Sequence, residues 1–217
     1  MKTDKIKITP LQAGISRGRL TALGQVPLLS PYPEMLAAAM KSSTGPTWWR
    51  RRKEIEAYEL LALAQISGRV VVLELELTES IRAIVQGDLP VPRLPEGANA
   101  IEVARNAVLA IRYPEVAVHA PQPGFAFVQV LGPDRVWLAN VAPGRVQALC
   151  LGATIPAAIP LRDLLIMSFG ALSMQTVMLD ERDHAGVLNA VAARWWQERL
   201  PLMPLTREPF IRAIGQA

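Results

Sequence analysis

Apolar and polar residues follow two different rhythms along the middle of the chain. In residues 48–65, apolar positions such as Ile55, Tyr58 and Leu61 recur at spacings of three and four, with arginine and glutamate between them. This spacing predicts an amphipathic helix. Gly68 is expected to end the helix, because glycine readily adopts the left-handed conformation common at helix C-termini.

The second rhythm is strand-like. In residues 69–81, the three leucines from Leu73 to Leu77 fall on one face of an extended chain and the glutamates mostly on the other, which predicts a half-exposed antiparallel strand. Residues 86–99 contain three prolines and two glycines and therefore predict a loop. Further strands are predicted at residues 107–115, 124–132 and 135–141, giving an antiparallel meander of about four strands.

The last third of the chain returns to a helical pattern. Residues 160–174 are mostly apolar with Pro160 at the first turn, which predicts a buried helix. Residues 183–200 predict a final helix with Asp183 as its N-cap. Its inward stripe is expected to be Val187, Val191 and Trp195.

The order of these elements predicts an α+β domain over residues 48–200. Residues 1–47 hold five prolines between short apolar runs, and we expect them to form an extension that packs on the domain or on a partner. Residues 201–217 are expected to form a C-terminal tail.

Composition narrows the class of protein. Of the 217 residues, 51% are apolar and 19% are charged, which is typical of a globular domain. The longest uncharged run, between Arg145 and Arg162, is broken by two prolines and a glycine, so no membrane association is expected. The first ten residues have no apolar core after their lysines, so no secretory signal is expected.

The cysteine and histidine counts limit the chemistry. One cysteine excludes an internal disulfide framework and fits a reducing cytoplasm. With only two histidines besides, multi-cysteine metal sites are excluded, and we expect neither a metal nor an organic cofactor.

A basic cluster begins the predicted first helix. It follows Trp48 and Trp49 and consists of Arg50, Arg51, Arg52 and Lys53. Cations beside stacking aromatics are typical of nucleic-acid surfaces, and that function stays as an alternative. A single cluster of this kind is more typical of a solvated helix face or a protein contact, so nucleic acid is not the expected partner.

The only cysteine, Cys150, has two interpretations. Leu149 and Leu151 flank it, as expected for a buried structural thiol. It also lies between the predicted meander and the predicted helices, and reactive groups are often placed on loops held by a rigid scaffold. His119 and His184 are available as bases, although no spacing ties either to Cys150, and His119 is expected to pack in its proline-rich corner.

The order of motifs over residues 48–199 resembles the ubiquitin-conjugating enzyme family. In that family a helix and a four-stranded meander precede an asparagine, the catalytic cysteine and further helices. The matching segments here are "RRRKEIEAYELL", "LAIRYPEVAVHAPQPGFAFV", "VWLANVAPGRVQALCLG", "IPLRDLLIMSFGAL" and "DERDHAGVLNAVAARWW".

The sequence also departs from the family pattern. Residues 138–140, "LAN", stand where the family has histidine–proline–asparagine, and Asn140 precedes Cys150 by ten residues (150 − 140), more than is usual. The family's tryptophan after the cysteine is missing, and the predicted loop around residues 81–100 is long. These departures suggest a divergent prokaryotic member of a bacterial ubiquitin-like conjugation system.

The resemblance implies a thioester carrier. Cys150 would accept the carboxyl terminus of a ubiquitin-like protein from an adenylating activating enzyme and pass it to an amine. Asn140 would stabilise the oxyanion or its loop, and Asp183 with His184 would orient the attacking amine. Each of the three also has a structural interpretation: a turn asparagine, a helix cap and a solvent-exposed histidine.

The same resemblance implies partners. The basic cluster at residues 50–53 would dock the activating enzyme, and a metal-dependent deconjugating peptidase is a further partner, encoded in the same operon. The chief alternative is a non-catalytic protein of the same fold that binds the ubiquitin-like protein or scaffolds the activating enzyme.

Overall fold

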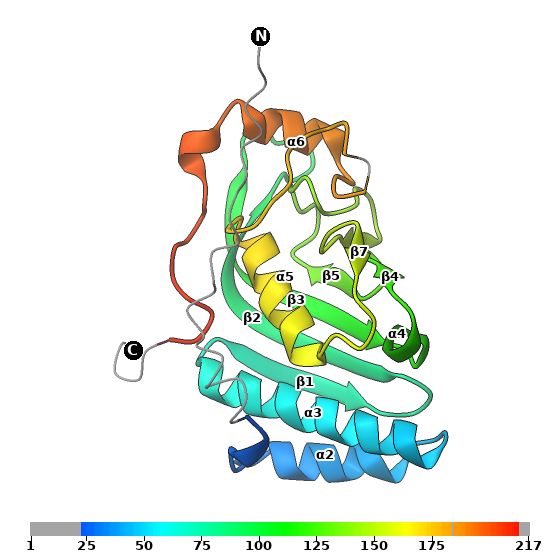
Figure 1. Cartoon of the computed structure of the whole chain (residues 1–217). Coiled ribbons are helices and arrows are strands. Elements are labelled where there is room, and N and C mark those ends of the chain that lie inside the picture. Colours follow the sequence, from blue (N-terminus) through cyan, green and yellow to red (C-terminus); the bar gives the residue numbers. More distant parts are fainter. Residues whose placement is uncertain (1–22, 184, 213–217) are drawn as a thin grey trace.

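The computed structural model describes residues 23–183 and 185–212 as an α+β structure. Its helices and strands are shown in Figure 1. In chain order they are η1 (Leu23–Gln25), α2 (Tyr32–Lys41), α3 (Thr47–Ser67), β1 (Val70–Glu76), β2 (Ile81–Arg93), β3 (Glu102–Tyr113), α4 (Val116–His119), β4 (Gln122–Pro123), β5 (Val128–Gly132), β6 (Gln147–Leu149), β7 (Thr154–Ile155), α5 (Leu161–Leu172), α6 (Ala190–Gln197) and η2 (Leu200–Leu202).

The main sheet is antiparallel and has five strands in the order β1-β2-β3-β5-β6. An antiparallel meander is therefore present, but only three of the four predicted strands, those at β1, β3 and β5, belong to it, and β2 and β6 were not predicted. The strands β4 and β7 form a separate two-stranded pair. Helix α5 crosses one face of the sheet, and α3 runs along its β1 side with α2 beneath (Figure 1).

The loop predicted at residues 86–99 is largely wrong, because β2 continues to Arg93 and β3 begins at Glu102. A bulge between Asp88 and Val91 removes two residues, one of them Pro90, from the ladder. Pro92 uses only its carbonyl on the side away from β3, where it accepts a hydrogen bond from Trp137 N. The missing proline N–H groups therefore cost no ladder hydrogen bonds.

The prediction of a strand at residues 135–141 is also wrong. This segment forms only isolated bridges, and the fifth strand is β6. The Gln147 side chain replaces the missing ladder: its Oε1 accepts from Val136 N at 2.7 Å and its Nε2 donates to Pro133 O at 2.8 Å. A side-chain amide thus satisfies backbone groups that a strand would have paired.

The alternation in β1 is interrupted. A bulge lies between Val72 and Glu74, so the residue between them has no partner in β2. As a result Leu73 is 45% exposed although Leu77 is completely buried. The expectation that the leucines of this strand share one face is wrong for Leu73, because a bulge reverses the order of faces.

Two predicted helices are confirmed. Helix α3 ends where expected, since Gly68 has φ 63° and forms the left-handed C-cap. Helix α5 begins directly after Pro160 and is mostly buried. Helix α2 had no predicted counterpart and packs against α3 and β1.

The last helix is shorter than predicted. It begins at Ala190, and Asn189 is its N-cap, accepting from Ala192 N at 3.1 Å. The prediction of Asp183 as the cap is therefore wrong. The inner stripe also differs, because Val191 is 66% exposed while Trp196 is buried.

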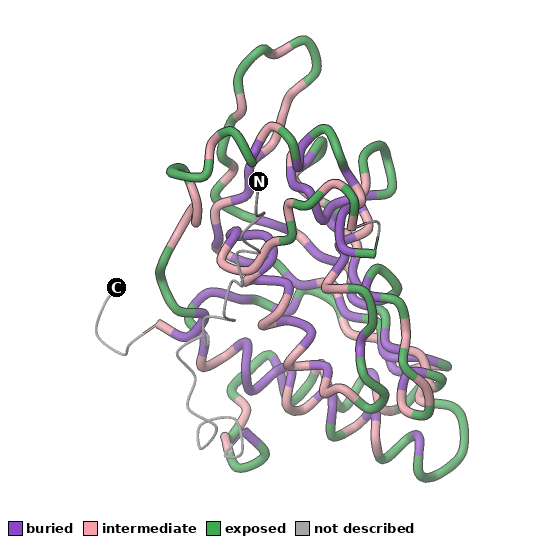
Figure 2. The backbone as a smooth tube through the Cα atoms, turned by 45° about the horizontal axis from the view of Figure 1, so that its top comes forward, coloured by how far each residue is buried: buried purple, intermediate pink, exposed green. Residues whose placement is uncertain are grey.

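The buried residues form one main core between the sheet and helices α3 and α5. Figure 2 shows buried stretches running through the middle of the molecule and exposed ones mainly at its periphery. Among the described residues, no helix combines the length and apolarity needed to cross a membrane.

Candidate active site around Cys150

Cys150 lies immediately after β6, at the start of a segment that leads to α5. We call residues 150–160 the cysteine loop; it includes the short strand β7. Two backbone hydrogen bonds fix its beginning: Cys150 N donates to Asn140 O at 2.7 Å, and Leu151 N donates to Gly124 O at 3.1 Å. The position of Cys150 is therefore fixed by β6, which precedes it, and by the segments around Asn140 and Gly124.

Gly124 makes an unusually close backbone contact with this loop. A Cβ atom on Gly124 would lie 1.8 Å from Gly152 O, a distance at which no side chain fits. Gly152 itself has φ +125°, which also favours glycine. The two glycines allow the proline-rich corner to press against the cysteine loop, and only the "PGF" context of Gly124 hinted at this in the sequence.

The Cys150 thiol is enclosed. It is 3% exposed, and its sulfur lies 3.3 Å from Gly152 O and 3.2 Å from Ala185 O. A thiol has one proton and can donate it to only one of these oxygens at a time. Burial raises the pKa of the thiol, and the negative charge of Asp183 acts in the same direction. The enclosure of Cys150 therefore favours the neutral thiol over the thiolate.

Asn140 touches the backbone of Cys150 rather than its sulfur. The side chain is 4% exposed, and its Nδ2 donates to Cys150 O at 3.4 Å. Its Oδ1 is buried and has no hydrogen-bond partner among the described residues. Together with the bond from Cys150 N to Asn140 O, this contact joins the two residues in both directions.

Asp183 reaches the same region from the other side of the loop. Its carboxylate accepts from Ala185 N at 3.1 Å, and its carbonyl accepts from Gly186 N and Val187 N. It thus shapes a turn next to the thiol. The predicted site residue His184 lies outside the described residues.

The residues that follow form a cover over the thiol. We call residues 185–189 the covering segment. Its Leu188 N and Asn189 N both donate to Ala139 O, at 2.8 Å and 2.9 Å. Val187 is buried in a small cluster with Ala139 and Ala193. Access to Cys150 therefore depends on this segment.

The basic cluster of α3 does not form one surface. Lys53 is completely buried, and its Nζ donates to the carbonyls of Leu77 at 2.6 Å, Thr44 at 2.8 Å and Thr78. Burial lowers the pKa of Lys53, and nearby Arg50 acts in the same direction. The prediction that Lys53 contacts a partner is wrong, because its ammonium group is used to fix the turn before β2.

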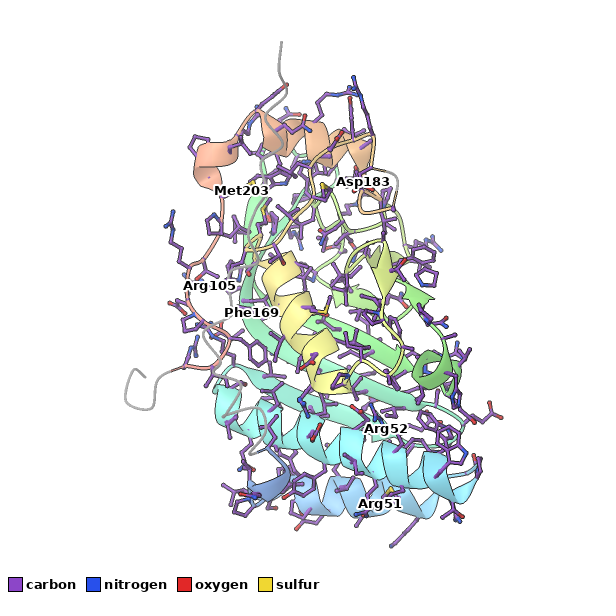
Figure 3. The ribbon with its side chains drawn as sticks, viewed as in Figure 1. Arg51, Arg52, Arg105, Phe169, Asp183 and Met203 are labelled. Carbon is purple, nitrogen blue, oxygen red and sulfur yellow. The ribbon has the colours of Figure 1, made fainter. Side chains whose placement is uncertain are left out.

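The three arginines of the cluster also differ from one another. Arg52 pairs with Glu56 at 2.5 Å and donates to Ala158 O at 3.1 Å. Arg50 is exposed, and Arg51 is exposed and pairs with Glu54. Figure 3 shows that Arg51 and Asp183 lie in widely separated parts of the molecule. The surface left for a partner is therefore remote from Cys150.

The corner that contains His119 packs on the start of α3. The imidazole meets the Trp48 indole edge to face, with ring centroids 5.1 Å apart, and Trp48 is 44% exposed. Tyr113 is fully buried at the end of β3, and its hydroxyl donates to Ile159 O at 2.8 Å. His119 thus packs in its corner, as expected, and Tyr113 supports the end of the cysteine loop.

Sequence reasoning missed Glu56, whose carboxylate is buried at the junction of α3 and α5. The signal available was a glutamate four residues after Arg52 on one helix face. Among the described residues, no three histidine, cysteine or acidic side chains are grouped to hold a metal ion.

The site therefore offers a single covered thiol next to a buried amide, a set of groups suited to acyl transfer once the thiol is uncovered. No family model, no curated protein and no solved structure shows a significant match to the chain.

Proposed function

We propose that this chain is a ubiquitin-conjugating-like protein that carries a ubiquitin-like protein as a thioester on Cys150 and transfers it to an amine. The observation that supports this most is the position of Cys150: it directly follows a strand of an antiparallel meander, is joined to Asn140, and precedes helix α5. This is the order of parts that the resemblance to conjugating enzymes implies.

The proposed reaction has two steps. In the first, the Cys150 thiolate attacks the thioester held by the activating enzyme, a new thioester forms on Cys150, and the enzyme's thiol leaves. In the second, an amine attacks the carbonyl carbon, an amide bond forms, and the Cys150 thiolate is released while the amine loses its proton. The incoming carbonyl is already activated, so a raised thiol pKa is compatible with the first step.

Asn140 and Asp183 have separate roles in this proposal. The Asn140 amide supports the backbone at Cys150 and provides a donor near the carbonyl oxygen that becomes negative. Asp183, beside the thiol, orients the attacking amine and favours loss of its proton. His184 keeps the same proposed role as its neighbour.

Access is part of the proposed mechanism. Cys150 is enclosed between the carbonyls of Gly152 and Ala185, so the covering segment must move before a ubiquitin-like tail can reach the sulfur. The segment is held to Ala139 by two hydrogen bonds to one oxygen. Breaking these bonds and the small apolar cluster around Val187 is within the free energy that binding of a protein partner supplies.

For the activating enzyme we propose a docking surface at the start of α3. It retains Arg50, Arg51 and the exposed Trp48 from the original cluster. An arginine beside an aromatic ring, with a second arginine whose exposed pair with Glu54 can exchange for a partner's carboxylate, suits an acidic partner surface. The nucleic-acid alternative is weaker, because Lys53 is buried and Arg52 is paired with Glu56.

The second candidate is a non-catalytic scaffold of the same fold. It is favoured by the 3% exposure of Cys150 and by Leu138 and Ala139 where the family has histidine and proline. In this case the chain binds the ubiquitin-like protein or the activating enzyme without forming a covalent bond.

A conjugation assay separates the two candidates. The chain is incubated with ATP, an adenylating enzyme and a ubiquitin-like protein, and resolved on a non-reducing gel. We expect an adduct that disappears with thiol reagent and is absent in Cys150→Ala. Asn140→Ala should still form the adduct but discharge it to lysine about 10-fold or more slowly. Binding of both partners without an adduct would favour the scaffold.

A further inference from the structure

The end of the cysteine loop lacks regular structure, yet several of its backbone groups have hydrogen-bond partners. Residues 156–160 contain two prolines and form no helix or strand. Residues 156–158 are exposed and residues 159–160 are half-buried, so their backbone groups bond either to water or to partners elsewhere in the molecule. Ala158 N finds one in Ala117 O at 2.8 Å, and side chains supply the others.

Three side chains converge on the residues just before and at the start of α5. Arg52 Nη2 donates to Ala158 O at 3.1 Å, and the Tyr113 hydroxyl donates to Ile159 O at 2.8 Å. Glu56 Oε2 accepts from Leu161 N at 2.6 Å and so satisfies a free N–H at the helix N-terminus. Two of these three side chains come from α3.

Arg52 and Glu56 act as one unit, because Arg52 Nη2 also pairs with Glu56 Oε1 at 2.5 Å. Glu56 is almost fully buried, and burial raises the pKa of its carboxyl group. The charge of Arg52 offsets part of the cost of keeping this carboxylate in the interior. Substituting either residue therefore disturbs both contacts to the loop.

The backbone that they hold is strained. Ala158 has φ 58°, a left-handed conformation that a residue with a Cβ rarely adopts. Such a conformation persists only when surrounding contacts enforce it. Here the enforcing contacts are on both sides of the residue: Ala117 O binds its N–H and Arg52 binds its carbonyl.

Between Cys150 and this point the loop is held by the buried side chain of Ile155, by the close contact of Gly152 with Gly124 and by few backbone hydrogen bonds. Its remaining backbone ties are the contact of Leu151 with Gly124 and the two-residue pair of β4 with β7. A strand pair this short is marginal by itself. The far end of the loop therefore contributes to keeping the whole loop, and the Gly152 carbonyl at the thiol, in place.

We propose that Arg52 and Glu56 are positioning residues for the cysteine loop: from helix α3 they set the path of residues 158–161 and, through it, the enclosure of Cys150. The importance of this for catalysis rests on the proposed function. This assigns the half-buried Arg52 to the support of the cysteine loop instead of the partner-binding cluster suggested by its neighbours Arg50 and Arg51.

The test uses the single cysteine of the full-length chain as its own probe. Labelling of Cys150 by 5,5′-dithiobis(2-nitrobenzoate) is followed in native conditions at several low urea concentrations. In Arg52→Gln we expect labelling about 10-fold faster than in the wild type, with little dependence on urea, because the loop opens locally. A merely destabilised protein would label through global unfolding, with a steep urea dependence.

Two further variants complete the test. Arg162→Gln is the matched control: it breaks the neighbouring Arg162–Glu59 pair between α5 and α3 but leaves the loop contacts, and should label within about 2-fold of wild type. Glu56→Gln keeps an acceptor for Leu161 N but loses the charge that holds Arg52, and should label at an intermediate rate. If Arg52→Gln does not fold, the labelling rate of Glu56→Gln tests the proposal in its place.

Equal labelling of Arg52→Gln and wild type, or an equal increase in Arg162→Gln, would overturn the proposal. The measurement requires neither a ubiquitin-like protein nor an activating enzyme. A failed conjugation assay therefore leaves this result standing, and a failed labelling test leaves the conjugation proposal standing.

Discussion

Two backbone segments meet at the Cys150 sulfur, and they are held in different ways. Gly152 belongs to a segment that continues from β6 and is tied to Asn140 and Gly124 by backbone hydrogen bonds. Ala185 belongs to the covering segment, which depends on the carbonyl of Ala139 and a small apolar cluster. The segment that positions the sulfur is thus held more firmly than the segment that covers it.

The largest effect is expected where the segment that contains Gly152 contacts Gly124. Gly124→Ala places a Cβ 1.8 Å from Gly152 O, so the corner and the cysteine loop must separate. We expect the free energy of unfolding to fall by about 3 kcal/mol, as for overpacking of a rigid site. Urea denaturation followed by tryptophan fluorescence measures the loss.

Gly24→Ala provides the control for that substitution. No atom lies within 4 Å of the Cβ that it adds, and the change should stay within about 0.5 kcal/mol of wild type. If Gly124→Ala were equally stable, the close contact between the corner and the loop would not exist in solution.

An intermediate effect is expected in the covering segment. Val187→Ala removes two methyl groups from the cluster with Ala139 and Ala193 and should cost about 1–2 kcal/mol. If the segment opens locally, labelling of Cys150 rises about 10-fold, which corresponds to about 1.4 kcal/mol. Val191→Ala, on the exposed side of α6, should change neither quantity. If Val187→Ala changed neither the stability nor the labelling rate, the covering segment would be held as firmly as the segment that contains Gly152.

The smallest effect is expected from the charge beside the thiol. Burial is the main cause of the raised pKa of Cys150 and Asp183 a lesser one, so Asp183→Asn should lower that pKa while leaving it above its usual value. Labelling near pH 8 should then rise about 2- to 3-fold, because more thiolate is present. The asparagine can still accept from Ala185 N, which keeps the turn.

The raised pKa of Cys150 also makes the stability of the folded protein depend on pH. The raised pKa means that the folded protein holds the thiol proton more tightly than the unfolded chain. The stabilising contribution of the thiol is complete below the thiol pKa of the unfolded chain and is lost as the pH rises through the higher pKa of the folded protein.

Asp180→Asn is the control for the labelling experiment. It changes a similar turn, in which Asp180 accepts from Arg182 N, and should leave the labelling profile unchanged. A wild-type profile in Asp183→Asn would show that its charge does not reach the thiol.

The elements best predicted from sequence are those in which local pattern and tertiary packing agree. Helices α3 and α5 combine apolar periodicity with clear stop and start residues, Gly68 and Pro160. Tyr113 likewise ends β3 directly before Pro114. In each case a local backbone preference coincides with the edge of a buried surface, so the sequence alone is sufficient to predict where the element begins or ends.

Other features depend on contacts between residues distant in the chain. The bulge that exposes Leu73 and the one that accommodates Pro90 depend on the strand that lies opposite. Gln147 replaces a strand ladder through contacts that no local pattern indicates. For these elements tertiary structure overrides a reasonable local reading.

The candidate site shows the same division. Cys150 and Asn140 can be selected from the sequence because they occur in a recognisable order of motifs. The burial of Lys53 and the role of Arg52 cannot, since both side chains have the same local context as the exposed Arg50 and Arg51. Which cation of a helical cluster turns inward depends on the carbonyl groups that other segments bring to it.

The pairing of Trp48 with His119 gives this molecule an intrinsic optical reporter. Trp48 is 44% exposed, whereas Trp137 and Trp195 are partly buried and Trp49 and Trp196 are buried, so a quencher added to the solution reaches Trp48 most readily. An activating enzyme seated over Arg50 and Arg51 would shield that indole. Docking at α3 can therefore be followed by loss of quenching, without attaching any dye to the chain.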